Sequence, residues 1–420
     1  MYKKFCKSLA IIFSSYVFLS YAKGALAIVK PSDSPNNPFG IHILDENDIE
    51  DAANLVNSEG GDWGYVTLVI RKDERDPKKW QKVFDKLREK HLIPIVRVAT
   101  RQQNDGWEKP SLDEIDGWVS FLNSLNWVVK NRYVVVGNEP NHAKEWGGEI
   151  NPEEYADYLI KFSIKLRERG SDFFVLPAGL DASAPNNSEH MSESTFLKRM
   201  FNRNNNVFDY IDGWTSHSYP NPNFSGSVSD EGRGSLKTYE WEMNLLKNLN
   251  VDKKFPIFIT ETGWAHNADY SKRGYFNEDT VASYLRYAYK TVWNDKRIVA
   301  VTPFVLNYQS SPFDIFSWKK REGQGFYDFY YEVQKIPKIK GLPVQINSGR
   351  IISILIPPAI RSEGKLLGIA YIENTGQSIW ERDKSLLIKV NNESIEIKPI
   401  SYFEDIVPKD KSLVFFNKVN

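Results

Sequence analysis

The chain has 420 residues, more than one ordinary hydrophobic core accommodates, so we expect one large domain with a smaller companion. Lysine plus arginine and aspartate plus glutamate each number 54, and this balance gives no support for nucleic acid or an anionic membrane surface as a partner. Aromatic residues make up 14% of the chain and include 12 tryptophans, which can fill a core or stack against the flat apolar faces of sugars.

The N-terminus predicts a signal peptide over residues 1–27. A basic stretch, Met1–Lys7, precedes a short apolar one, Ser8–Ala22, and the Ala-Leu-Ala sequence at 25–27 fits a small-residue cleavage site. We therefore expect a secreted, periplasmic or cell-surface protein, and an uncleaved membrane anchor stays open as an alternative. The single cysteine, Cys6, lies in this segment, so the mature chain would hold no disulfide, thiolate metal site or cysteine nucleophile.

Short apolar runs alternate with amphipathic stretches after a linker at residues 28–38 that is rich in proline, asparagine and serine. The predicted strands are Phe39–Leu44, Trp63–Arg71, Leu92–Thr100, Tyr133–Asn138, Phe173–Gly179, Ile211–Ser216, Phe255–Glu261 and Val299–Leu306. The predicted helices include Pro77–Lys90, Leu112–Val129, Pro152–Arg169, Glu193–Asn202, Ser235–Asn250 and Asn277–Asp295. Two of these helices begin on capping signals, Asp76-Pro77 and Asn151-Pro152.

Eight strands alternating with helices over residues 39–340 predict an α/β fold, a (β/α)8 TIM barrel. The alternative is an open doubly wound sheet, which usually carries a glycine-rich phosphate loop after its first strand. The first predicted strand here ends Gly40-Ile-His-Ile-Leu44 without such a loop. The barrel also explains polar groups at strand ends, because its active sites lie on the C-terminal face.

The pattern changes after a junction at residues 336–343. Residues 344–420 contain short strand-like runs split by turns such as Asn374-Thr-Gly376, and they predict a small β-sandwich. This accessory domain could bind carbohydrate or act as a spacer. An appendage that simply packs on the barrel explains the pattern equally well, since Trp380 is its only tryptophan.

Two glutamates mark the predicted mouth of the barrel. Glu139 and Glu261 each end an apolar, β-branched run and are followed by proline or by threonine and glycine. A carboxylate is out of place inside a buried strand, so each should lie where its strand emerges. The fourth and seventh strands lie across the mouth from one another, so the two carboxyls can converge on one substrate. Paired carboxyls of this kind are what cleavage of a glycosidic bond requires.

The two acids would take different roles. Glu139 would protonate the leaving oxygen, which calls for a raised pKa, while Asn138 would hydrogen-bond the sugar hydroxyl beside the reacting carbon. Glu261 would stay ionised as the nucleophile, helped by Arg71 or Arg97 at the ends of the second and third strands. The structural alternative for each acid is a helix-capping loop or an ion pair that serves stability alone.

Further candidate residues follow other strands. His217 and Tyr219 come after the sixth strand, where Tyr219 could hydrogen-bond Glu261, and His42 in the first strand would line the sugar site or the core. Tryptophans in loops are candidates for stacking against sugar rings; these are Trp264, Trp318, Trp107 and Trp146. The six histidines show no HExxH spacing, and Walker and GxSxG motifs are absent, so we expect no metal and no organic cofactor.

Three motifs together resemble the retaining glycoside hydrolases of clan A. They are Gly137-Asn-Glu-Pro140, Ser216-His-Ser-Tyr219 and Ile259-Thr-Glu-Thr-Gly-Trp264. The Glu139 region, with Pro152-Glu-Glu-Tyr155 shortly after it, is similar to family 39 and family 5 enzymes. The resemblance implies a TIM barrel, an oligo- or polysaccharide substrate, and double displacement by carboxyls about 5–5.5 Å apart. The eighth strand departs from the pattern because it ends Thr302–Asn307 without a tryptophan; Phe304 or Trp318 would take that place.

Other functions stay open at the level of sequence. The barrel could bind polysaccharide without cleaving it, or the chain could be a cell-surface structural protein whose C-terminal domain provides the function. Within enzymes, a sugar rather than water could intercept the covalent intermediate, which would give transglycosylation.

Overall fold

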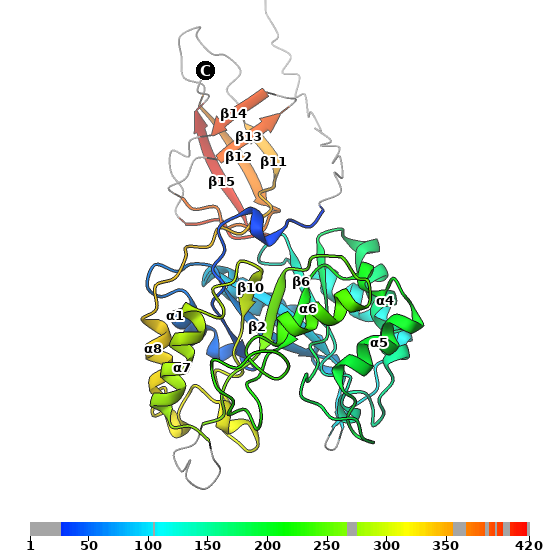
Figure 1. The fold of residues 1–420 in the computed structure, drawn as a ribbon. Coiled ribbons are helices and arrows are strands. Elements are labelled where there is room, and N and C mark those ends of the chain that lie inside the picture. Colours follow the sequence, from blue (N-terminus) through cyan, green and yellow to red (C-terminus); the bar gives the residue numbers. More distant parts are fainter. Residues whose placement is uncertain are drawn as a thin grey trace, which may run out of the picture.

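The computed structural model describes residues 27–103, 106–266, 275–355, 367–382, 386–390, 393–397 and 404–417 (Figure 1). Residues 1–26, which carry nearly all of the predicted signal peptide, lie outside this set. Within the described ranges no helix combines the length and the apolar character needed to cross a bilayer.

Strands and helices alternate from Gly40 to Gln334, with one short hairpin inserted after the third strand. The strands of this part are β1 (Gly40–Ile43), β2 (Gly64–Arg71), β3 (Leu92–Ala99), β6 (Arg132–Val136), β7 (Phe173–Pro177), β8 (Trp214–His217), β9 (Ile257–Glu261) and β10 (Ile298–Val301). The helices that follow them in turn are α1 (Ile49–Val56), α2 (Pro77–Glu89), α3 (Ile115–Ser124), α4 (Pro152–Arg169), α5 (Glu193–Arg203), α6 (Thr238–Asn248), α7 (Glu278–Lys290) and α8 (Asp328–Gln334). A small hairpin, β4 (Gln102–Gln103) with β5 (Gly106–Trp107), follows β3.

The eight strands are parallel and form two sheets, in the orders β1-β2-β3-β6-β7 and β10-β9-β8. The sheets meet at both edges, because Asp181 after β7 pairs with His217 of β8, and Phe39 before β1 pairs with Val301 of β10. A backbone bond of 2.9 Å from Val301 N to Pro38 O supports the second seam. The α/β class with a parallel sheet is therefore confirmed, and the two seams close the sheet into a ring, unlike an open doubly wound sheet.

Local sequence explains these elements. The strands are buried on both faces, as in β6, where four of five residues are buried, so they read as continuous apolar runs. The helices bury one stripe, as Trp80, Phe84 and Leu87 do in α2. Both predicted caps form: the Asp76 side chain accepts from Lys78 N, and the Asn151 side chain accepts from Glu154 N.

The C-terminal part holds an antiparallel sheet of β11 (Gly349–Leu355), β12 (Leu367–Asn374) and β15 (Lys411–Asn417), beside a hairpin of β13 (Leu386–Val390) and β14 (Glu393–Ile397) (Figure 1). The two pieces do not establish a β-sandwich, so that expectation stays a prediction. The boundaries expected at residues 28–38, 39–340 and 344–420 likewise stay predictions.

The C-terminal part attaches at the N-terminal end of the barrel strands. Asn126 Nδ2 donates to Gly376 O at 2.9 Å, and Gln377 Nε2 donates to Val129 O at 2.9 Å, just before β6 begins. The segment that precedes β1 fastens to the same end, since Val29 exchanges two hydrogen bonds with the side chain of Asn131. The described residues of both segments therefore attach at the end of the barrel opposite its C-terminal mouth.

Candidate active site

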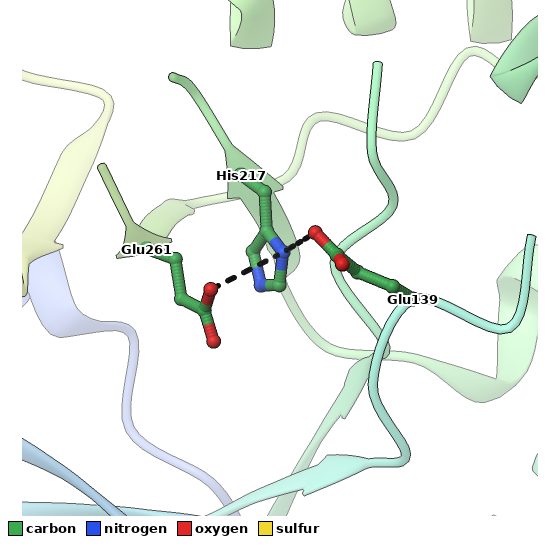
Figure 2. A group of neighbouring side chains, drawn as sticks. All are labelled: Glu139, His217 and Glu261. Atoms are coloured by element: carbon green, nitrogen blue, oxygen red, sulfur yellow. Dashed lines mark hydrogen bonds and ion pairs between the residues drawn. The ribbon is translucent and has the colours of Figure 1, made fainter. Parts of the chain in front are cut away.

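Three strand ends bring two carboxyls and an imidazole together at the mouth of the barrel (Figure 2). Glu139 follows β6, His217 ends β8 and Glu261 ends β9. His217 Nδ1 lies 2.7 Å from Glu139 Oε1 and 3.9 Å from Glu261 Oε2. One ring nitrogen of His217 and one carboxyl oxygen of each glutamate all lie within 4.8 Å of one another. The acids from the fourth and seventh barrel strands thus share one small space.

The backbone at Glu139 is turned sharply to achieve this. Gly137 has φ of 93° and Glu139 has φ of 31°, a left-handed conformation that is costly for a residue with a Cβ. Glu139 is held there by bonds from its own N to Gly179 O at 3.0 Å and from His142 N to its carbonyl at 2.8 Å. Gly179 must also lack a side chain, because a Cβ there would collide with the His217 imidazole.

Arg97 on β3 connects the groups around Glu261. Its Nη1 donates to Glu261 Oε1 at 2.7 Å and to Asn138 Oδ1 at 2.5 Å. The Tyr219 hydroxyl donates to the other oxygen, Glu261 Oε2, at 3.2 Å. Both oxygens of Glu261 therefore accept a hydrogen bond, which fixes the carboxylate plane while the side chain stays 11% exposed.

Electrostatics keep Glu261 ionised. Burial alone would raise the pKa of Glu261, but the nearby positive charges of His217 and Arg97 outweigh it and lower that pKa. Burial would lower the pKa of His217, whereas the charges of Glu261 and Glu139 and the hydrogen bond to Glu139 raise it. Burial, together with the negative charge of Glu261, raises the pKa of Tyr219 well above its usual value, so Tyr219 remains a hydrogen-bond donor.

Two predicted roles are wrong on geometry. Arg71 pairs with Glu74 Oε1 at 2.6 Å and with Asp73, whereas Arg97 is the arginine that contacts Glu261. Trp264 and Trp318 are only 2% and 3% exposed, and neither presents a ring face to a sugar. The two tryptophan side chains are buried because burying a large aromatic surface is strongly favourable, and Trp318 packs edge-on against Phe329.

His42 lies behind the site rather than on its surface. The side chain is fully buried, and its Nε2 is 4.0 Å from Glu261 Oε1. Neither ring nitrogen has a hydrogen-bond partner, and burial lowers the pKa of His42 to about 3, so the ring is neutral. Its ring meets Phe304 edge-on at 5.1 Å. Of the two places expected for His42, the sugar site and the core, the structure therefore favours the core.

Sequence reasoning missed Glu145. This half-buried acid lines a cavity of about 30 Å³ together with Arg97, Asn138 and the half-exposed Trp107. Burial and the charge of Glu139 raise the pKa of Glu145 to about 7, against the opposing effect of Arg97. Nothing in the sequence separates Glu145 from an exposed loop acid, and Gly179 likewise carries no signal of its own.

Glu139, His217 and Glu261 also form the one group within the described ranges whose donor atoms are close enough to hold a metal ion. The guanidinium of Arg97 already contacts Glu261 at 2.7 Å, and a second cation beside it would be repelled. The arrangement fits proton transfer and nucleophilic attack better than metal coordination.

Several solved structures are similar to this chain. An endo-β-1,4-glucanase from Xanthomonas axonopodis pv. citri, with three substitutions, shares 13% identity over 71% of this chain and 99% of its own, with a TM-score of 0.45. A β-xylosidase from Caulobacter crescentus shares 13% over 81% and 75%, at 0.49, and a β-mannanase from Thermomonospora fusca shares 13% over 73% and 93%, at 0.46.

These neighbours are glycoside hydrolases, the class that the three sequence motifs resemble. No family model matches the chain. No curated protein matches it either.

Proposed function

We propose that the protein is an exported retaining β-glycoside hydrolase that acts by double displacement. The observation that carries this proposal is the approach of Glu139 and Glu261, which place carboxyl oxygens within 4.8 Å of one another. Retaining enzymes separate their carboxyls by about 5–5.5 Å, whereas inverting enzymes need about 6.5–9.5 Å to admit a water.

In the first step, Glu261 attacks the anomeric carbon and forms an ester bond. The bond to the leaving oxygen breaks, and that oxygen takes the proton of Glu139. In the second step, Glu139 takes a proton from water, the water oxygen bonds to the anomeric carbon, and Glu261 leaves as a carboxylate. Arg97 and Tyr219 hold Glu261 in place through both steps, and Asn138 is positioned by Arg97 to meet the neighbouring sugar hydroxyl.

A panel of β-linked glycans tests the proposal, with products identified by mass and the anomer of the first product read by proton NMR. We expect release of sugars with a β anomer formed first. Glu261→Ala should abolish turnover without unfolding the protein, while Glu149→Ala, an exposed acid beyond the site, should leave turnover unchanged.

Full activity of Glu261→Ala, or an α anomer as the first product, would contradict the mechanism. Glycan binding with no released sugar would instead favour a non-catalytic binding barrel. Transfer of the glycosyl group to added sugar would identify a transglycosylase that uses the same two acids.

A further inference from the structure

Two acids that the proposed mechanism does not use are buried behind β8. Glu193 begins α5 and is 1% exposed, and Glu242 lies in α6 and is fully buried. Glu242 Oε2 accepts from Trp214 Nε1 at 3.0 Å. The other three carboxyl oxygens of the pair have no hydrogen-bond partner as long as both groups are taken as ionised.

A proton on one of the two carboxyls resolves this. Each carboxyl lies near enough to affect the protonation of the other, and an O–H on one of them would give the unpartnered oxygens of the pair a hydrogen bond. Burial raises the pKa of Glu242 to about 7 and, with the charge of Glu242, raises the pKa of Glu193 well above its usual value. Two adjacent buried carboxylates cannot both be ionised without a large cost.

Other elements around the pair add small and opposing effects. Asp181, after β7, repels a charge on Glu193, and Arg233, in the loop before α6, attracts one. On β8, the charge of His217 and the nearby hydroxyl of Ser216 favour a charge on Glu242, and Trp214 Nε1 donates to it. No residue among those described supplies an ion-pair partner in contact with either carboxyl.

Trp214 and Ser216 project from the outer face of β8, and His217 at the end of the same strand faces the acid pair of the mouth. We propose that Glu193 and Glu242 share one proton and act as positioning residues, joining α5 and α6 to β8 and so fixing His217. Two carboxyls and a serine provide too few oxygens for calcium, which takes six to eight, so a proton is the better occupant.

Denaturation by urea at about pH 5 and about pH 8.5 tests the shared proton. A carboxyl whose pKa is higher in the folded chain than in the unfolded chain contributes its full stabilisation at a pH below the unfolded-state value. That stabilisation is lost as the pH rises through the folded-state value. The wild-type midpoint should therefore fall at the higher pH, and Glu242→Gln, which keeps an acceptor for Trp214, should lose part of that fall, since Glu193 keeps a pKa that burial raises. Glu240→Gln, on the same helix and partly exposed, should behave as wild type.

Two spectroscopic measurements complete the test. The infrared spectrum of wild type at neutral pH should show a protonated-carboxyl band that Glu193→Gln loses, whereas Glu242→Gln keeps it, because burial holds the proton on Glu193. The NMR titration of the His217 imidazole should move to lower pH in Glu242→Gln, because the neighbouring negative charge is gone.

The proposal is wrong if Glu193→Gln keeps the infrared band, or if wild type and Glu242→Gln share one pH dependence of stability. It is also wrong if added calcium, reversed by a chelator, raises the wild-type midpoint. Should either glutamine variant fail to fold, the infrared band of wild type and its loss on raising the pH still decide the question. None of these readouts needs a substrate, so they stand apart from the test of hydrolysis.

Discussion

At the scale of single residues, Arg97 holds the geometry of the site. One nitrogen of its guanidinium serves both Glu261 and Asn138, and its charge lowers the pKa of Glu261. Removing a preorganised donor of this kind costs about 10²–10³ in kcat.

Arg97→Met should therefore lower kcat by about 10²–10³ and move the acid limb of the pH–rate profile to higher pH, since the pKa of Glu261 rises. Steady-state kinetics over a pH series measure both effects. Arg71→Met is the matched control, because Arg71 bonds only acids outside the site, and it should stay within about twofold of wild type. Equal losses in the two variants would remove the special role of Arg97.

His42 offers a prediction about stability. Its ring nitrogens are buried without partners, which costs about 1–3 kcal/mol. His42→Leu should raise the free energy of unfolding by about 1 kcal/mol. Because the folded pKa of His42 is lowered to about 3, wild-type stability falls as pH drops below the unfolded value of 6.5, so the gain should be larger at about pH 5. Urea denaturation at two pH values measures this, and a less stable leucine variant would refute it.

The sequence alone predicted some residues of the site and gave no signal for others. Glu139 and Glu261 stood out because an acid ends an apolar run, and Arg97 was one of two equivalent candidates. Choosing it over Arg71 required the register of the sheet, in which Arg71 lies opposite Ala99, two residues beyond Arg97. Glu145, Glu193 and Glu242 resemble surface acids, because burial on a helix or loop depends on tertiary packing that the sequence does not display.

At the scale of elements, the helix caps make a local test possible. The Asn151 side chain accepts from Glu154 N at 3.1 Å, with Pro152 at the first helical position. Asn151→Ala should lower the free energy of unfolding by about 1 kcal/mol, the usual cost of losing such a cap. Lys237→Ala, at the start of α6 where no side chain caps the helix, should change it by less than about 0.5 kcal/mol. Equal effects would mean that the cap at α4 contributes nothing.

Apolar periodicity located all eight barrel strands, because a parallel sheet buried on both faces leaves an unbroken hydrophobic run. The ends were less certain. The prediction Ile211–Ser216 started early, since Asp212 bonds the backbone of β7 and β8 begins at Trp214. The prediction Val299–Leu306 ran too far, since β10 ends at Val301 and the following residues turn to bond β1 and the loop after β9.

At the scale of the whole molecule, the C-terminal part and the mouth occupy opposite ends of the barrel (Figure 1). A chain that ends at Pro343 should therefore keep kcat on soluble oligosaccharides within about twofold, as no group in the mouth is lost. The thermal midpoint should drop, because the truncation removes the bonds of Gly376 and Gln377 to the barrel. Loss of turnover in a truncated chain that remains folded would show that the C-terminal part acts on the site.

The segments on either side of the barrel fasten to one end of it, through Asn131 for the first and through Asn126 and Val129 for the second. A particle coupled to the C-terminal strands would consequently present every molecule with its opening directed outward into the medium. Immobilised in this way, the protein could reach polysaccharides too large to diffuse between it and the particle. Random coupling through surface lysines would instead turn a share of the openings toward the particle.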